Sequence, residues 1–323
     1  LQMFITIHSL IASVSLTALG SQNTTTHFVT EFVLLGFPGP REMQNFFFSL
    51  ILVVYLLTLL GNGAIVCAVK WDRQLHTPMY LFLGNFAFLE MWYVSTTIPN
   101  MLANILSDTK TISFTGCFLQ FYFFFSLGTA ECFFLSVMAY DRYLAICRPL
   151  HYPSIMTGKF CLILVCVCWV SGFLCHPVSI VLISQLSFCG PNIIDHFVCD
   201  PGPLFPLVCI PVPSTELICY TVTSINIFGP FLFILGSYIL VLRAVFRVPS
   251  GAGRTNTLFI QIFIIPHLSL RLFEIFKQCD IVFFVTLVYS VVTPLLNPLI
   301  YSLRNKDMKD ALRRVLGLGI NQN

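Results

Sequence analysis

Long apolar runs separated by short polar connections dominate this chain of 323 residues. A helix that crosses a bilayer needs about 20 mostly apolar residues. Six runs clearly reach that length, at 46 to 69, 78 to 103, 116 to 141, 160 to 183, 217 to 242 and 281 to 303. A seventh run, 257 to 280, also carries Arg271, Glu274 and Lys277. The pattern predicts an all-α membrane protein.

Composition supports a bilayer as the solvent of this chain. Apolar residues make up 57% and charged residues 10%, against roughly a quarter charged in soluble domains. Mean hydropathy is +0.86, and no linker or low-complexity tract divides the chain. We therefore expect one membrane domain at 46 to 303, with an extracellular segment at 1 to 45 and a cytoplasmic helix and tail at 304 to 323.

Basic residues predict the orientation. Cytoplasmic connections carry an excess of Lys and Arg, and here most of the 17 basic residues fall in alternate connections and the tail. They are Lys70, Arg73, Arg142, Arg148, Lys159, Arg243, Arg247, Arg254, Arg304, Lys306, Lys309, Arg313 and Arg314. The N-terminus is then extracellular and the C-terminus cytoplasmic, which requires seven spans because six would place the basic tail outside.

The seventh run is apolar enough to insert. Its thirteen Leu, Ile and Phe residues favour insertion by very roughly 4 to 8 kcal/mol, whereas Arg271 near its middle opposes it by at most about 3 kcal/mol. The prediction is therefore a seven-transmembrane helix bundle, followed by a short amphipathic helix.

Modification signals agree with an extracellular N-terminus. Asn23-Thr24-Thr25 fits the glycosylation acceptor pattern. Residues 1 to 20 are apolar and end in small residues, as in a signal peptide, but lack its positive start. Four cysteines, Cys117, Cys189, Cys199 and Cys209, fall on the predicted outer side, where two disulfides are expected.

Several motifs in order resemble the odorant receptors within the rhodopsin-like G-protein-coupled receptors. They are Gly61-Asn62, "LHTPMYLFLGNFAFLE" at 75 to 90, "MAYDRYLAICRPLHY" at 138 to 152, Ser237-Tyr238, and "PLLNPLIYSLRNKDMKDAL" at 294 to 312. The resemblance runs from about Thr30 to Leu316. It implies a receptor that binds small volatile molecules and activates a stimulatory heterotrimeric G protein, raising cyclic AMP at the plasma membrane.

The resemblance gives roles to the motif residues. It implies that Asp141 restrains Arg142 at rest and that activation releases Arg142 toward the G protein. The alternative role of the two charged residues is simple anchoring at the membrane interface. The remaining switch residues that it implies are Tyr143, Tyr238, Asn297, Pro298 and Tyr301. It also implies disulfides between Cys117 and Cys199 and between Cys189 and Cys209. With those bridges, "HFVCD" at 196 to 200 has no thiolate for a metal.

Glu90 and Glu131 lie well inside predicted spans, where ionisable residues are rare and usually functional. The family motif places Glu90 near Asn297 and opposite Glu131. Two close carboxylates cannot both stay charged without compensation. Either a sodium-like cation lies among Glu90, Glu131 and Asn297, or the two carboxylates share a proton; no other cofactor is expected.

An apolar stripe with few polar groups along the third span suits a small ligand. Its members are Phe121, Phe124, Phe125, Gly128, Thr129 and Cys132, and the resemblance adds Val222 and Asn226 from the fifth span. Thr129 and Asn226 are the expected hydrogen-bonding groups. Such a stripe is also what ordinary core packing produces.

One segment departs from the family. Odorant receptors begin the sixth span with a "KAFSTC" type stretch, whereas this chain reads "NTLFIQIFIIPHLSLRLFEIFKQCDIVFF" at 256 to 284. The sixth helix is the one that opens the G-protein cavity in this family. The alternative prediction is thus a signalling-defective copy of a receptor.

Other protein classes fit less well. A transporter or channel calls for repeated halves, broken helices or rings of charge, and the sequence has none of these. No HExxH, GxSxG or Walker-type motif indicates an enzyme. Membrane lipid, an odorant and a G protein are the expected partners, and nucleic acid is not.

Overall fold

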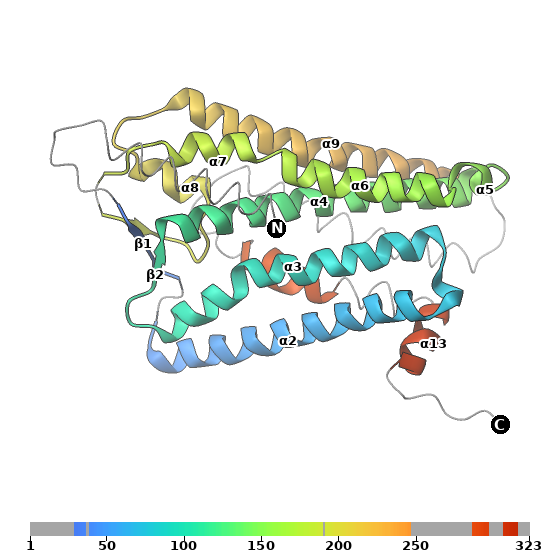
Figure 1. The fold of residues 1–323 in the computed structure, drawn as a ribbon, viewed down its shortest axis with the longest axis horizontal. Helices are drawn as coiled ribbons and strands as arrows, with labels where there is room; N and C mark the ends of the chain where they lie inside the picture. The colour runs from blue at the N-terminus through green and yellow to red at the C-terminus, as the bar shows by residue number, and fades with distance from the viewer. Residues whose placement is uncertain (1–28, 37–38, 190, 247–285, 297–305, 316–323) are drawn as a thin grey trace. The chain divides into compact units, whose positions relative to one another are not determined.

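The computed structural model describes residues 29–36, 39–189, 191–246, 286–296 and 306–315 (Figure 1). Two compact units make up the chain. Unit 1 comprises Leu1–Leu52, Ser95–Ser126 and Phe173–Thr223, and unit 2 comprises Val53–Val94, Leu127–Gly172 and Ser224–Asn323. Several predicted features lie outside the described residues: Asn23, the leader-like residues 1 to 20, the run 257 to 280, and Asn297, Pro298 and Tyr301.

Long helices occupy the predicted spans. They are α2 (Arg41–Trp71), α3 (Pro78–Leu106), α4 (Phe114–Cys147), α6 (Gly158–Leu174) with α7 (Pro177–Ser184), and α9 (Pro213–Phe246). Within the described part of the chain, four segments are long and apolar enough to cross a membrane: Arg41–Trp71, Phe114–Cys147, Gly158–Ser184 and Pro213–Ala244. The all-α membrane architecture is therefore confirmed.

The fourth predicted span, 160 to 183, is confirmed as a segment able to cross a membrane at Gly158–Ser184, but its helix is interrupted. Helix α6 ends at Leu174 and α7 begins at Pro177. Proline has no N–H to donate to the carbonyl of the residue four positions earlier, which here is Phe173. The hydroxyl of Tyr122 donates to that carbonyl instead, at 3.0 Å. Tyr122 thus satisfies a backbone acceptor that Pro177 leaves without its helical donor.

Unit 1 contains a small sheet that an all-helical reading did not predict. Strand β1 (Glu31–Leu34) lies between β2 (Thr111–Ser113) and β3 (Ile193–Ile194). It pairs antiparallel with β2 and parallel with β3. Phe32 on β1 is fully buried, and its ring packs edge-on against Phe188 with 5.5 Å between ring centroids. The sheet thereby joins the segment before α2 to two connections that are far apart from it in sequence.

Close packing in unit 2 explains one residue of the "LHTPMYLFLGNFAFLE" motif. A Cβ atom added at Gly84 of α3 would lie only 3.2 Å from a methyl carbon of Val69 on α2. Next to it, Asn85 accepts a hydrogen bond from the indole N–H of Trp169 on α6, at 3.3 Å. Small and polar residues here let the helices approach and fix their contact.

Short elements of unit 2 follow the helix ends. They are the 3-10 turn η1 (Arg73–Leu75), the helix α5 (Tyr152–Ile155) and the terminal helix α13 (Lys306–Val315). Helix α13 buries Met308 and Ala311, which lie three residues apart, and exposes Lys306, Lys309, Arg313 and Arg314. This is the short amphipathic helix that the sequence predicts.

A π-helical segment, η3 (Val288–Val292), lies within the helical residues 286–296 of the last predicted span. Such segments insert one extra residue into a helix turn and occur often at functional sites. Further along this helix, the carbonyl of Pro294 accepts from the amide nitrogen of Asn62, at 3.1 Å. Asn62 is only 1% exposed, so the Gly61-Asn62 motif of α2 anchors this helix.

Two more short elements complete unit 1. Helix α8 (Pro201–Leu204) starts directly after Asp200, whose carboxylate caps it by accepting from the N–H of Gly202 at 2.7 Å. The 3-10 turn η2 (Phe205–Leu207) follows. These turns place Cys209 where it reaches Cys189.

Candidate functional site

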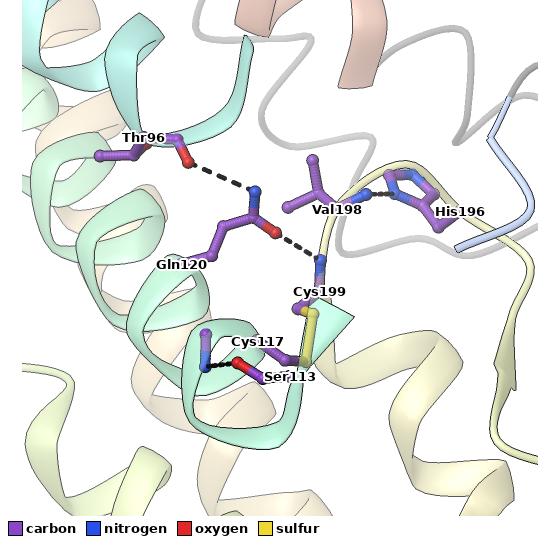
Figure 2. Close-up of a disulfide and its surroundings, with 8 residues drawn as sticks. Thr96, Ser113, Cys117, Gln120, His196, Val198 and Cys199 are labelled. Atoms are coloured by element: carbon purple, nitrogen blue, oxygen red, sulfur yellow. Dashed lines mark hydrogen bonds between the residues drawn. A yellow bond between two sulfur atoms is a disulfide. The ribbon is translucent and has the colours of Figure 1, made fainter. Parts of the chain in front are cut away.

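Two disulfides hold the connection between α7 and α9 in unit 1. Cys117, near the start of α4, is bonded to Cys199, with 5.5 Å between their Cα atoms. Cys189 is bonded to Cys209, with 4.8 Å between their Cα atoms. These are the pairs that the family resemblance implies. The first bridge ties the loop before α8 directly to α4 (Figure 2).

Gln120 attaches the same loop to α4 in addition to the disulfide. The sequence analysis did not predict this role of Gln120. Its amide nitrogen donates to the carbonyl of Thr96 on α3, at 3.3 Å. Its carbonyl oxygen accepts from the backbone N–H of Cys199, also at 3.3 Å. Figure 2 shows the side chain reaching both partners from the helix turn above Cys117. A lone amide among phenylalanines, three residues after a paired cysteine, was the available signal.

The loop histidine makes a local bond. The Nδ1 atom of His196 accepts from the N–H of Val198, at 3.1 Å, and its ring stacks on Phe197. Burial lowers the pKa of His196, while the nearby carboxylates of Asp200 and Asp195 act to raise it. Because Nδ1 accepts this bond and Cys199 is in a disulfide, "HFVCD" serves here as a loop-shaping segment. No group of three or more His, Cys, Asp or Glu residues that could hold a metal occurs in the described ranges.

The predicted ligand residues of unit 1 form a buried aromatic surface. Phe121 and Phe124 on α4 are each 2% exposed. The ring of Phe125 packs edge-on against Phe121, with 4.9 Å between centroids, and lies 5.8 Å from the ring of His176. Val222 on α9 is half-buried.

The remaining predicted ligand residues belong to unit 2. Gly128, Thr129 and Cys132 continue the same side of α4 and are all buried. Asn226 on α9 is 9% exposed. Burial of this kind is also what ordinary core packing produces, so the ligand role of these residues stays a prediction.

Both predicted carboxylates are buried in unit 2. Glu90 on α3 is fully buried and Glu131 on α4 is 2% exposed. The third member of the predicted ion site, Asn297, lies outside the described residues. Charged side chains at such positions need compensation, which keeps both the cation and the shared proton open.

At the end of α4, Asp141 has a partner that the sequence did not indicate. Its carboxylate oxygen accepts from the hydroxyl of Tyr152 on α5, at 2.8 Å. Asp141 is 3% exposed, and Arg142 follows it with partial exposure. Burial raises the pKa of Tyr152, and the bond to Asp141 raises it further. The phenol therefore stays protonated at neutral pH and remains a donor.

Of the other predicted switch residues, the structure describes two and leaves three outside its described residues. Tyr143 on α4 is half-buried, and Tyr238 on α9 is 3% exposed. Asn297, Pro298 and Tyr301 lie outside the described residues. The structure therefore places Asp141, Arg142, Tyr143 and Tyr238 on helix ends of unit 2.

An ion pair that the sequence analysis also missed joins α13 to the connection between α2 and α3. The guanidinium of Arg314 contacts the carboxylate of Asp72 and donates to the side-chain oxygen of Gln74 at 3.3 Å. Asp72 also caps η1 by accepting from the N–H of Gln74, at 3.0 Å. Hydrogen bonds from Arg314 and then from this N–H hold the pKa of Asp72 below its usual value.

Comparison with known proteins gives the family. The model of the olfactory receptor family matches residues 51–318. Olfactory receptor 11H6 of Homo sapiens is 72% identical, over 99% of this chain and 100% of that protein. Olfactory receptor 11H4 of Homo sapiens is 61% identical, over 92% of this chain and 95% of that protein. Olfactory receptor 6N1 of Homo sapiens is 46% identical, over 89% of this chain and 95% of that protein.

Helices apolar enough to cross a membrane and a disulfide-bonded loop agree with this match, and the family is one of rhodopsin-like, seven-transmembrane receptors of the plasma membrane. Within that class, the chain belongs to the olfactory receptor family. It is a receptor, not an enzyme.

Proposed function

We propose that this receptor binds small volatile odorants within its helices and activates a stimulatory heterotrimeric G protein, raising cyclic AMP. The observation that carries the signalling part is the buried bond between Asp141 and Tyr152. It holds the residue next to Arg142 in one position at rest. A ligand that favours a second arrangement of this helix end would release Arg142 toward the G protein.

Odorant binding is supported by the residues along α4. Phe121, Phe124 and Phe125 are aromatic groups of unit 1, and Thr129 and Asn226 are buried polar groups of unit 2. Ligand sites are mostly apolar with a few polar groups that fix orientation. We infer that Thr129 and Asn226 donate to or accept from the polar group of the odorant.

The orientation is part of the proposal. The N-terminus is extracellular, Asn23 is glycosylated, and the C-terminus is cytoplasmic. Support comes from the Lys and Arg distribution. The disulfides Cys117–Cys199 and Cys189–Cys209, which belong to an oxidising compartment, lie in unit 1. The basic exposed face of α13 lies in unit 2, where it suits an anionic cytoplasmic lipid surface.

A sodium-like cation at Glu90, Glu131 and Asn297 is the proposed ion site. It rests on the burial of both carboxylates. Replacing sodium by choline at constant chloride should lower the apparent Tm of the wild-type chain and leave Glu90→Gln unchanged. Equal Tm values in the two salts would favour the shared proton.

A cyclic AMP reporter tests the main proposal in cells that carry an N-terminally tagged chain. Tag staining without permeabilisation establishes surface expression and the extracellular N-terminus. At least one odorant of a broad panel should then raise cyclic AMP. Arg142→Gln should remove the response at equal surface expression. Surface expression with no response to any odorant, or agonist-free ion flux in its place, would contradict the receptor proposal.

A signalling-defective receptor is the second candidate, and one observation favours it. Residues 256 to 284 do not follow the family pattern of the sixth span. The alignment with Olfactory receptor 11H6 also has more positions, 335, than the chain has residues. Replacing 255 to 285 by the corresponding segment of that relative separates the candidates. A response from the replacement alone would assign the defect to this segment.

A further inference from the structure

A small cavity that is open to solvent and has room for about one water-sized molecule lies entirely in unit 1. It is formed where β1 ends, α3 ends and the loop after β3 begins. Its walls are mainly apolar, from Leu34, Met101, Ile105 and Phe197. All four of the predicted ligand residues of unit 1 lie elsewhere, so this cavity is distinct from the proposed odorant site.

Asn104 supplies a hydrogen-bond donor to this cavity. It lines the cavity from the last turn of α3. Its Nδ2 atom is buried and has no hydrogen-bond partner within the described residues. A buried donor without an acceptor is unfavourable, and such groups are normally satisfied by water or a bound ligand. The amide therefore calls for an acceptor in the cavity.

Lys110 supplies a positive charge to the same cavity. Its ammonium donates to the backbone carbonyl of Leu35, at 3.3 Å, and it makes no ion pair with any described residue. The nearby carboxylate of Asp108 is instead paired with Arg41, at 3.3 Å. The cation at the cavity is thus left without a neutralising carboxylate among these residues.

The backbone of Lys110 adopts a conformation that is unfavourable for lysine. Its φ is +41°, the left-handed region that side chains with a Cβ atom disfavour. The N–H of Leu34 donates to its carbonyl at 2.9 Å and holds it there. Glycine would adopt this conformation at no steric cost. A strained residue whose side chain reaches a cavity fits a functional position.

We propose that this cavity binds one small monovalent anion, chloride or a carboxylate group, held by the Nδ2 of Asn104 and the ammonium of Lys110. The unpartnered Nδ2 of Asn104 and the ammonium of Lys110 are both N–H donors, and no carboxylate among the described residues lines the cavity, so an anion is favoured over a cation. The apolar walls lower the local dielectric constant and strengthen the attraction. The anion satisfies the amide and neutralises the lysine together. It also links the end of β1 to the end of α3, because Lys110 bonds to the backbone of Leu34 and Leu35 and Asn104 lies on the last turn of α3.

Thermal stability of the full chain tests the site without an odorant or a G protein, so a failure of odorant signalling does not affect the result. The fluorescently tagged chain is solubilised in detergent, heated, and assayed by size exclusion in sodium chloride or in sodium isethionate, whose bulky sulfonate carries no carboxylate. Ionic strength and sodium are held equal. An anion at ~10 times its Kd should raise the apparent Tm by about 2 to 4 °C.

Matched variants identify the residues. Lys110→Gln should remove the chloride effect, and Lys110→Arg should retain it. Lys159→Gln removes one exposed lysine of unit 2 and should respond as the wild type does. Asn104→Leu, which removes the donor and keeps the volume, should lose at least half of the effect, and it stands in if Lys110→Gln does not give a monomeric peak.

Several outcomes decide the matter. Equal Tm values in chloride and isethionate would overturn the proposal and leave the cavity to water. A chloride effect that persists in Lys110→Gln and in Asn104→Leu would place the anion elsewhere and would also overturn it. Formate and acetate form a further arm. Stabilisation by chloride and formate alone assigns the site to a free small anion, and stabilisation by acetate assigns it to the carboxylate group of a larger molecule.

Discussion

Replacement of Tyr152 by Phe isolates the bond that fixes the end of α4. The phenylalanine keeps the ring and removes only the hydroxyl that donates to Asp141 at 2.8 Å. Asp141 is 3% exposed, so water cannot readily replace the lost donor. A hydrogen bond to a charged, buried group contributes about 1.5 to 3 kcal/mol. For a protein of this size that should lower the apparent Tm by roughly 3 to 10 °C.

Size-exclusion thermal stability of the tagged, solubilised chain measures this loss. Ser154→Ala is the control, because Ser154 lies on the same short helix and its exposed hydroxyl donates to the carbonyl of His151 at 2.8 Å. It should change the apparent Tm by less than about 2 °C. If Tyr152→Phe is no worse than Ser154→Ala, the bond to Asp141 does not hold the helix end.

The pH dependence of the same variant carries a definite sign. Burial and the bond to Asp141 raise the pKa of Tyr152 above its unfolded value. A raised pKa gives a contribution that is complete below the unfolded pKa and is lost as the pH rises through the folded pKa. The Tm difference between wild type and Tyr152→Phe should therefore stay constant from about pH 6 to pH 9. A difference that shrinks within this range would refute the assignment of the phenol as donor.

Three further changes test other contacts. Asp72→Asn weakens the pairing with Arg314, whose side chain is half exposed. Hydrogen exchange of residues 306–315 should accelerate roughly fivefold, since an ion pair near the surface contributes up to about 1 kcal/mol. The lowered pKa of Asp72 makes this contact complete above the unfolded pKa and lost on acidification through the folded pKa; unchanged exchange would contradict the docking role. Gln120→Leu should lower the apparent Tm by roughly 2 to 8 °C, because the N–H of Cys199 loses its acceptor; a higher Tm would argue against the bridge. Gly84→Val should reduce folded yield, because its new Cβ atom meets Val69 at 3.2 Å; a normal yield would show that the helices part freely.

Hydropathy predicted the described helices well because the insertion of a helix into the bilayer depends on the summed free energies of transferring its residues from water into the bilayer. Helix α4, predicted at 116 to 141, runs over Phe114–Cys147 and so extends further by more than one and a half turns at its C-terminal end. The break before Pro177 was not predicted, because a hydropathy sum does not register the missing N–H. A helix rule for proline would have found it.

Contacts between distant segments could not be read from the sequence. Strand β3 has only two residues, and its ladder with Val33 and Leu34 depends on a loop that the Cys117–Cys199 bridge positions. Gln120 and Tyr152 were likewise missed, because nothing in their local sequence shows which backbone N–H or carboxylate lies opposite. The disulfide pairs were available only through the family resemblance, since four cysteines allow three pairings.

The histidine of the disulfide loop gives a last prediction, in which acid should weaken unit 1. Burial lowers the pKa of His196 in the folded chain. The unfolded chain then binds more protons between that folded pKa and the unfolded value near 6.5, so stability falls as the pH drops through this window, by at most about 1.4 kcal/mol per pH unit for one proton. His196→Asn separates this effect from a structural one, because its side-chain oxygen takes the place of Nδ1 as acceptor for the N–H of Val198 but does not titrate. We expect the wild-type apparent Tm to fall more than that of His196→Asn between pH 7.5 and pH 5.5, with every other titrating group common to both proteins. Equal falls in the apparent Tm of the two proteins would mean that protonation of His196 does not destabilise the loop. The contribution of this residue to stability would then come from the hydrogen bond to Val198 and not from its charge state.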